Sequence, residues 1–442
     1  MNIAEFVKYF DYITIVVSVL IAVRSVRDLR NSSRYIVYYL FFVVFILPLA
    51  LDYLIGKPVY SGLQVNYGFE LSYDDDMTRI LYDIFVLGTQ IIILKCFKKR
   101  RFHIRLSGKN NLSKPYEIST TLDIKMRRIC LFFAAVAPIF MTIRGYYQVL
   151  FRFGWRDRQL YKGISSSAYY GICEKLTYIG VTAAILLLLS KYDKKAKQGI
   201  FLRILSGILL MMNSCIEAKR AILFYVLIVI IIVLIQMRNV NIRAIAIFAL
   251  ISVIGVLAYT YVVKIVFRGY VVGDGLYRTI RIDMFRDDTV KMSIYGIMHP
   301  DEIKILDYPF QSYLMQIKYF IITSLISGLH IIHIPGVGYD QYFSAALAHT
   351  SLDNPIVQMT VSMFDEAIAN FGYFGFFIAP IVCAIVCRKI DEITDFEKVL
   401  WLGGFVLYMM FPLKYILYYI EIVGIIYVLL RAKWEKGGIL FK

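Results

Sequence analysis

The sequence predicts an all-α polytopic integral membrane protein with about eleven transmembrane helices and one large extracytoplasmic loop. The chain of 442 residues is 59% hydrophobic and 16% aromatic, and its mean hydropathy is +0.64. Apolar runs of roughly the 20 residues that a bilayer span needs recur from end to end. Helices satisfy their own backbone polar groups in lipid, so the spans are predicted to be helical.

The predicted spans follow the apolar runs in chain order. They are 6–23, 35–55, 77–97, 129–143, 168–190, 200–216, 221–237, 244–266, 366–387, 399–412 and 415–430. The first is predicted to be a retained span and not a signal peptide, because Glu5 comes early and neither a basic region nor a small-residue cleavage site is present.

The distribution of Lys and Arg predicts the orientation. Six segments of only 80 residues hold 27 of the 49 Lys and Arg: 24–34, 98–128, 191–199, 238–243, 388–398 and 431–442. Cytoplasmic loops collect basic residues, so these segments are predicted to lie inside, with the N-terminus outside and the C-terminus inside. Orientation then accounts for much of the net charge of +17, which in a soluble protein would suggest nucleic acid.

The longest predicted outer segment is 267–365. Its run 312–336 is apolar enough to be a span, but counting it would move the basic segments 388–398 and 431–442 outside. We therefore expect a re-entrant or surface-lying helix there. The predicted division is a transmembrane bundle at 1–266, an extracytoplasmic loop at 267–365, and C-terminal helices with a cytoplasmic tail at 366–442.

A second set of basic residues lies on the predicted outer side. It consists of Arg144, Arg152, Arg156, Arg158, Lys219, Arg220, Arg268, Arg278, Arg281 and Arg286. Arginine grips phosphate oxygens through a planar fork, and a basic residue deep in a bilayer costs about 2.5–3.5 kcal/mol. The set predicts an anionic ligand at the outer boundary; pairing with nearby acids or lipid headgroups is the alternative. Lys219 and Arg220 occupy a tight turn between two predicted spans, in "EAKRAILFY" (217–225).

The stretch "MFDEAIANFGYFGFF" (363–377) opens the ninth predicted span. Asp365 and Glu366 come first, and Asn370 follows one turn later on the face of Glu366. Gly372 and Gly375 permit close helix approach. A carboxylate that enters a membrane is a functional candidate, and desolvation suits it to act as a general base. Capping of the helix N-terminus is the alternative.

The remaining polar groups give weaker signals. His330 and His333 are predicted to pack among aromatic residues, whereas His349, in a turn-rich segment, is a candidate for substrate contact. The acidic segment 73–77 ("YDDDM") is predicted to cap the third span in preference to binding a metal. Tyr339 and other outer tyrosines suit either the membrane interface or stacking on sugars. The six cysteines form no CxxC pair and are predicted to be buried apolar residues.

Three features together resemble the Wzy-type polymerases of polysaccharide repeat units (O-antigen, capsule or exopolysaccharide). A basic turn lies between mid-chain spans, at "AKRAILF" (218–224). A large outer loop bearing arginines comes late in the chain, and the span opening "EAIANFGYFG" (366–375) follows it. The architecture resembles the family over most of the chain, and the motifs cover about twenty residues. Members often have more spans and internal termini, from which this chain departs.

The resemblance implies a glycosyltransferase that needs neither nucleotide sugar nor metal and no other cofactor. Its substrates would be undecaprenyl-pyrophosphate-linked oligosaccharide and the growing polysaccharide, at the outer face of the bacterial cytoplasmic membrane. Chain-length regulator and flippase proteins are implied partners. Cations would stabilise the pyrophosphate leaving group, with Glu366 or His349 as the base for the acceptor hydroxyl. The residues expected to bind substrate are Lys219, Arg220, Arg268, Arg278, Arg281, Arg144, Tyr339 and Asn370.

Three other functions remain open from the sequence. An O-antigen ligase would use the same donor with a lipid A core acceptor. A flippase for lipid-linked oligosaccharides would need charges in a central cavity and pseudo-symmetric halves, and no internal repeat is found. A sugar transferase that uses a polyprenyl monophosphate would favour a metal-binding carboxylate in an early outer loop, a role that 73–77 allows.

Overall fold

The structure is a computed structural model that divides into two compact units. Unit 1 comprises Met1–Pro115, Val271–Ile322 and Ile334–Leu417, and unit 2 comprises Tyr116–Tyr270, Thr323–His333 and Tyr418–Lys442. The residues that the structure describes are 2–29, 32–57, 68–97, 124–146, 168–189, 197–217, 281, 285–322, 338–352, 359, 361–393, 395–414, 417, 420, 424, 432–435 and 438–441.

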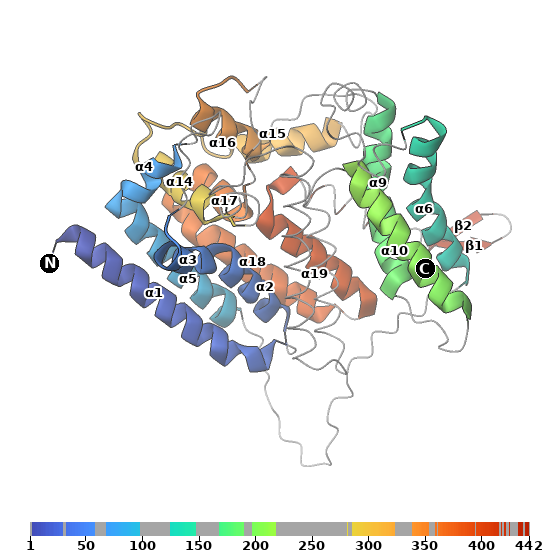
Figure 1. Cartoon of the computed structure of the whole chain (residues 1–442), viewed down its shortest axis with the longest axis horizontal. Helices are drawn as coiled ribbons and strands as arrows, with labels where there is room; N and C mark the ends of the chain where they lie inside the picture. Colours follow the sequence, from blue (N-terminus) through green and yellow to red (C-terminus); the bar gives the residue numbers. More distant parts are fainter. Residues whose placement is uncertain are drawn as a thin grey trace, which may run out of the picture. The chain divides into compact units, whose positions relative to one another are not determined.

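Unit 1 is built from helices (Figure 1). Its longest are α1 (Ile3–Ser25), α5 (Asp76–Lys95) and α18 (Gly375–Glu392). The others are η1 (Val26–Asp28), α2 (Ser33–Phe41), η2 (Phe42–Ile46), α3 (Leu47–Leu54), α4 (Phe69–Asp74), α14 (Asp287–Met298), α15 (Gln311–Phe320), α16 (Tyr339–Ala348), α17 (Met363–Phe371), η5 (Gly372–Phe374) and α19 (Asp395–Met410).

Four helical segments in the described part of the chain are long and apolar enough to cross a membrane. They are Ile3–Ser25, Ser33–Leu54, Asp76–Lys95 and Met363–Glu392. They match the predicted runs 6–23, 35–55, 77–97 and 366–387, which are thereby confirmed as helices of suitable length and composition. The run 399–412 contains a shorter apolar helix, Trp401–Met410. The runs 221–237 and 244–266 lie outside the described residues, as does almost all of 415–430.

One end of unit 1, here called the Asp391 end, is held together by polar contacts between helix termini. Asp391, in the last turn of α18, accepts hydrogen bonds from the Ser32 hydroxyl and from the backbone N–H of Ser33 at 2.8 Å, at the start of α2. The buried Arg34 donates to the carbonyls of Leu94 and Cys96 at the end of α5. A carboxylate at a helix N-terminus and a cation at a C-terminus both match the helix dipole.

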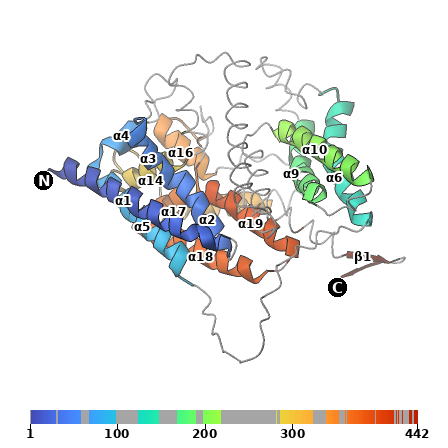
Figure 2. The same ribbon diagram turned by 60° about the horizontal axis from the view of Figure 1, so that its bottom comes forward.

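The opposite end, here called the Asp11 end, joins α1, α3 and α5. Asp11 of α1 accepts hydrogen bonds from Tyr53 of α3 and from Arg79 of α5. The first half of α1, the first turn of α5 and the last turn of α3 therefore lie together, while the end of α5 and the start of α2 lie at the Asp391 end. Figure 2 shows α1, α2, α5 and α18 running alongside one another in this unit.

Helix α14 is buried against the Asp11 end. Every residue from Arg286 to Gly296 is buried, and the helix packs on α4, α5 and α17. An aromatic cluster joins it to α4 and α16 and includes Phe69, Tyr73, Tyr339 and Phe343. Residues 285–298, which belong to the predicted outer loop 267–365, thus form part of the core of unit 1.

Unit 2 contains three helices packed on one another within its described residues: α6 (Ile124–Ile143), α9 (Ala168–Leu189) and α10 (Lys197–Glu217). They match the predicted runs 129–143, 168–190 and 200–216. Asn213 of α10 donates to the Ala134 carbonyl of α6 at 2.8 Å. The strands β1 (Ala432–Glu435) and β2 (Gly438–Phe441) pair as an antiparallel hairpin in the predicted cytoplasmic tail, which is an exception to the helical pattern.

Helix α15 covers the first part of the ambiguous run 312–336, and residues 323–337 lie outside the described residues. The re-entrant or surface-lying helix therefore stays a prediction, as does the predicted division at 266 and 366.

The predicted close approach at Gly375 is found within the α17–α18 turn. A Cβ at Gly375 would lie 2.5 Å from the carbonyl oxygen of Ala367 and 2.6 Å from the Cα of Ile368, and both are backbone atoms. Gly372 has a positive φ of 60°, a backbone conformation that favours glycine. Both glycines thus let the chain turn tightly from α17 into α18.

We expect Gly375→Ala to lower the free energy of unfolding by about 1–3 kcal/mol or more, because the added methyl must displace backbone. Gly88→Ala is the matched control, since a Cβ at Gly88 in α5 meets nothing within 4 Å. Thermal unfolding of the purified variants in detergent measures both. Equal melting temperatures for the two variants would contradict the close approach.

Candidate functional site

A polar cavity of about 190 Å³ opens at the Asp11 end of unit 1. It is lined by Ala4, Lys8, Asp11, Leu49, Asp52, Tyr53, Lys57, Tyr73, Arg79, Tyr82 and Lys291. Four of these side chains are cationic and two are carboxylates. The cavity therefore combines a surplus of positive charge with three tyrosines.

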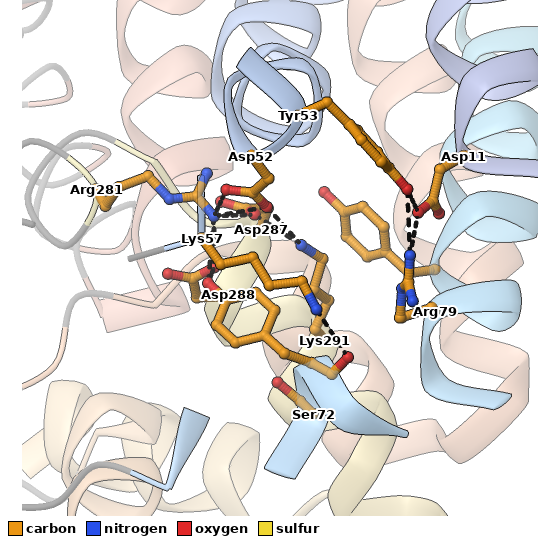
Figure 3. Close-up of polar contacts among 12 residues, drawn as sticks. Asp11, Asp52, Tyr53, Lys57, Ser72, Arg79, Arg281, Asp287, Asp288 and Lys291 are labelled. Atoms are coloured by element: carbon orange, nitrogen blue, oxygen red, sulfur yellow. Dashed lines mark hydrogen bonds and ion pairs between the residues drawn. The ribbon is translucent and has the colours of Figure 1, made fainter. Parts of the chain in front are cut away.

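Behind the cavity lies a buried ionic cluster that is centred on Arg281 (Figure 3). Its Nη2 contacts Asp287 at 2.8 Å and Asp288 at 3.0 Å, both in the first turn of α14, and Asp52 of α3 at 3.2 Å. Lys291, one turn along α14, contacts Asp287 at 3.0 Å. Two acidic residues at the start of a helix, followed at i+4 by a lysine, form a favourable local charge pattern.

The cations offset the cost of burying these carboxylates. Burial raises the pKa of Asp287 to about 7, and Arg281 and Lys291 oppose that rise. Burial by itself lowers the pKa of Lys291, but Asp287 and Asp52 raise it by more, so the net pKa of this lysine lies above its ordinary value. The Nε and Nη1 atoms of Arg281 have no hydrogen-bond partner within the described residues, so this guanidinium keeps donors beyond its carboxylate contacts.

At the mouth of the cavity the cations crowd one another. Lys57 donates to the Tyr73 carbonyl at 3.2 Å and lies over the Tyr73 ring, 5.2 Å from its centroid. Burial lowers the pKa of Lys57, and the like charges of Arg79 and Lys291 lower it further. An anion bound here would relieve that repulsion.

The predicted residues Glu366 and Asn370 do lie together, but in a second buried network. The Glu366 carboxylate accepts hydrogen bonds from the Ser312 hydroxyl at 3.1 Å, from the Gln316 amide, and from the Leu413 backbone N–H at 2.9 Å. The Asn370 amide donates to the Ser312 hydroxyl at 2.7 Å. Glu366 is fully buried, and this network joins α17 to α15 and to the chain that follows α19.

The other predicted residues are dispersed. Tyr339 is buried, with its hydroxyl 2.7 Å from Ser293 Oγ of α14. His349 is exposed at the C-terminus of α16, where its φ of 50° ends the helix. Arg144, in unit 2, lies over the Tyr169 ring at 5.9 Å. The remaining predicted binding residues lie outside the described residues: Lys219, Arg220, Arg268 and Arg278.

The structure also places the acidic segment 73–77 and the predicted outer residue Arg286. Asp75, in the acidic segment 73–77, accepts a hydrogen bond from the Thr78 N–H at 2.7 Å, which confirms the predicted cap of the third span. Arg286 is buried, where its Nε donates to the Met410 carbonyl at 3.4 Å. Burial lowers its pKa to about 10, and the charge of Asp365 opposes this shift.

The sequence reasoning missed most residues of the cavity. Asp11, Asp52 and Arg79 lie inside or at the edge of predicted spans, and Lys57 directly follows one. An ionisable residue within a predicted span is itself a signal of a functional or paired site. Applying that criterion to the first three spans would have found them.

No protein-family profile, curated protein sequence or solved structure matches the chain. The assignment of a function therefore rests on the chemistry of these residues.

We expect Arg281→Met to lower the free energy of unfolding by about 3–5 kcal/mol, because it leaves buried carboxylates without their cation. The loss should grow as the pH rises. A carboxyl group whose pKa is higher in the folded than in the unfolded state favours folding while it is protonated. That contribution to the free energy of unfolding is lost as the pH rises from the unfolded-state pKa to the folded-state pKa. Lys304→Met, which removes an exposed partner of Asp307, is the control. A stable Arg281→Met protein at alkaline pH would contradict the cluster.

We expect Glu366→Gln to lower the free energy of unfolding by about 1–3 kcal/mol. The carboxylate accepts hydrogen bonds through both oxygens, and in the variant an amide N–H group would face one of those donors. Glu392→Gln, at the exposed end of α18, is the control. Chemical denaturation in detergent measures both variants. Unchanged stability with loss of activity would instead favour the general-base role.

Proposed function

We propose that this protein polymerises undecaprenyl-pyrophosphate-linked oligosaccharide repeat units at the outer face of the bacterial cytoplasmic membrane. It would be a lipid-pyrophosphate-dependent glycosyltransferase. The observation that best supports this is the cavity at the Asp11 end, where Lys8, Lys57, Arg79 and Lys291 outnumber two carboxylates. Fixed cations of this kind stabilise the charge that develops on a departing pyrophosphate.

The arrangement of helix ends agrees with the proposed topology. Lys95 lies at the Asp391 end, whereas Met363 begins α17, which packs on α14 at the Asp11 end. If α5 and α17–α18 cross the membrane, an odd number of crossings must separate them. The sequence predicts five, at 129–143, 168–190, 200–216, 221–237 and 244–266, with 312–336 not crossing. An odd number agrees with the predicted eleven spans, and the basic segments 24–34 and 388–398 next to the Asp391 end support an outer location for the cavity at the other end.

The proposed reaction forms a bond between the acceptor hydroxyl oxygen and the anomeric carbon of the growing chain. The bond from that carbon to the pyrophosphate oxygen breaks, and undecaprenyl pyrophosphate leaves with the electron pair. Lys57, Arg79 and Lys291, which line the cavity, would hold the pyrophosphate. Tyr53, which lines the cavity and is only half-buried, offers a ring for sugar contact.

We assign the acceptor proton to a carboxylate of the cavity, in preference to the enclosed Glu366. Asp52 is the candidate for this role, because it lines the cavity between Arg281 and Lys291, at 3.2 and 3.8 Å.

We expect Lys57→Gln to slow polymer formation by purified protein from lipid-linked units by roughly 10²-fold, which is typical for loss of one donor to a developing anion. Lys304→Gln, at an exposed lysine outside the cavity, should leave the rate unchanged. A full rate in Lys57→Gln would place the pyrophosphate elsewhere.

A strain that lacks the protein should accumulate single lipid-linked units on the outer face. Accumulation on the inner face would instead identify a flippase, and polymer that remains on its lipid carrier would identify a ligase. Both outcomes would overturn the proposed polymerase.

A further inference from the structure

The buried face of α1 is polar and lies against α5. Its buried residues include Asp11, Thr14 and Ser18, while large apolar side chains such as Ile13 and Leu20 are exposed. Across the interface, the Gln90 amide of α5 donates to the Ser18 hydroxyl at 2.7 Å. Asp11 and Ser18 of α1 therefore have hydrogen-bond partners on α5 along this seam.

Asp83 of α5, one turn along from Arg79, is a buried carboxyl group in the same seam. Its side chain is 1% exposed, and no described residue donates a hydrogen bond to either carboxyl oxygen. The polar groups nearest to it are the Thr14 hydroxyl and the Asp11 carboxyl of α1, and neither meets it in ordinary hydrogen-bond geometry. An ionised carboxylate in such a position would be heavily penalised, because these two groups replace little of the water that it has lost.

The immediate neighbour of Asp83 is the carboxyl group of Asp11. Two ionised carboxylates have only acceptor atoms, so they cannot form a hydrogen bond unless one carries a proton. Asp11 already accepts hydrogen bonds from Arg79 and Tyr53, which stabilise its ionised form. The proton therefore belongs on Asp83, from which it can be donated to Asp11.

The surrounding charges favour a proton over a metal cation. Arg79 lies one turn away on α5, Lys291 of α14 interacts electrostatically with Asp83, and Asp52 and Tyr53 of α3 line the same cavity. Helix α18 packs on α5 through Phe376 against Phe85, and α2 contributes Tyr38 at Gln90. No group of three or more side chains that could hold a metal ion is found among the described residues, whereas a proton needs no coordination shell.

We propose that Asp83 is a buried proton-binding site: a neutral carboxylic acid that shares its proton with Asp11 beneath the cavity. Because protonated Asp83 is neutral, it adds no further negative charge beneath the cavity. The cavity thereby keeps the positive surplus that an anionic ligand needs. The inference rests on the α1–α5 interface and holds whatever reaction the cavity serves.

Infrared difference spectroscopy of the purified full-length protein tests this inference. At a pH above the pKa of Asp287, which is about 7, the parent should still show the C=O stretch of a protonated carboxylic acid, and Asp83→Asn should lose it. Asp301→Asn, at an exposed position, should keep it. Asp83→Asn should also keep the parent's melting temperature, because the amide mimics the neutral acid in shape and charge. An unchanged band in Asp83→Asn would overturn the proposal.

A second measurement separates a proton from a metal ion. The melting temperature of the parent should not change when sodium is replaced by a bulky organic cation at constant ionic strength. A sodium-dependent melting temperature that disappears in Asp83→Asn would overturn the proposal in favour of a cation site. Neither measurement uses polymer formation, so failure here is distinguishable from failure of the proposed function.

Discussion

The contact on which unit 1 depends is the pairing of Arg281 with Asp52, Asp287 and Asp288. Each of these groups would be prohibitively costly to bury alone, because a charge that leaves water needs an equivalent partner. The burial of α14 and the position of α3 therefore depend on each other, because α14 can enter the core only where α3 presents Asp52. Through Lys291 and the Tyr73 hydroxyl, the same requirement fixes α4 and α5 around α14. The walls of the cavity follow from this set of contacts.

The sequence determines the helices more directly than their partners. Apolar runs predict α1, α2–α3, α5 and α17–α18 because length and hydropathy are local properties. The pairing of Asp52 with Arg281 joins positions 229 residues apart, and no local pattern specifies it. The entry of α14 into the core is missed for the same reason: its residues 287–291, "DDTVK", are as polar as a surface loop, and only their long-range charge partners explain their burial.

Glu366 illustrates the difference between finding a residue and finding its role. Its position at a span opening singles it out, and it is indeed a fully buried carboxylate. Its three donors come from Ser312, Gln316 and Leu413, which are 47 to 54 residues away in sequence. A buried carboxylate with few hydrogen-bond donors around it can still bind a proton or a ligand. A buried carboxylate that is surrounded by donors instead holds secondary-structure elements together. Only the number of donors separates these roles, and that number is a tertiary property.

In lipid, burying apolar groups gives little preference for one helix face over another, because the acyl chains are as apolar as leucine. Helix α1 therefore takes its orientation from Asp11, Thr14 and Ser18, which face inward while Ile13 and Leu20 face outward. One of these polar residues, Asp11, also lines the cavity. Fold and site thus depend on the same atoms at the Asp11 end, and a substitution there changes both. Loss of activity in a cavity variant therefore indicates a chemical role only when the packing of α1 against α5 is shown to be intact.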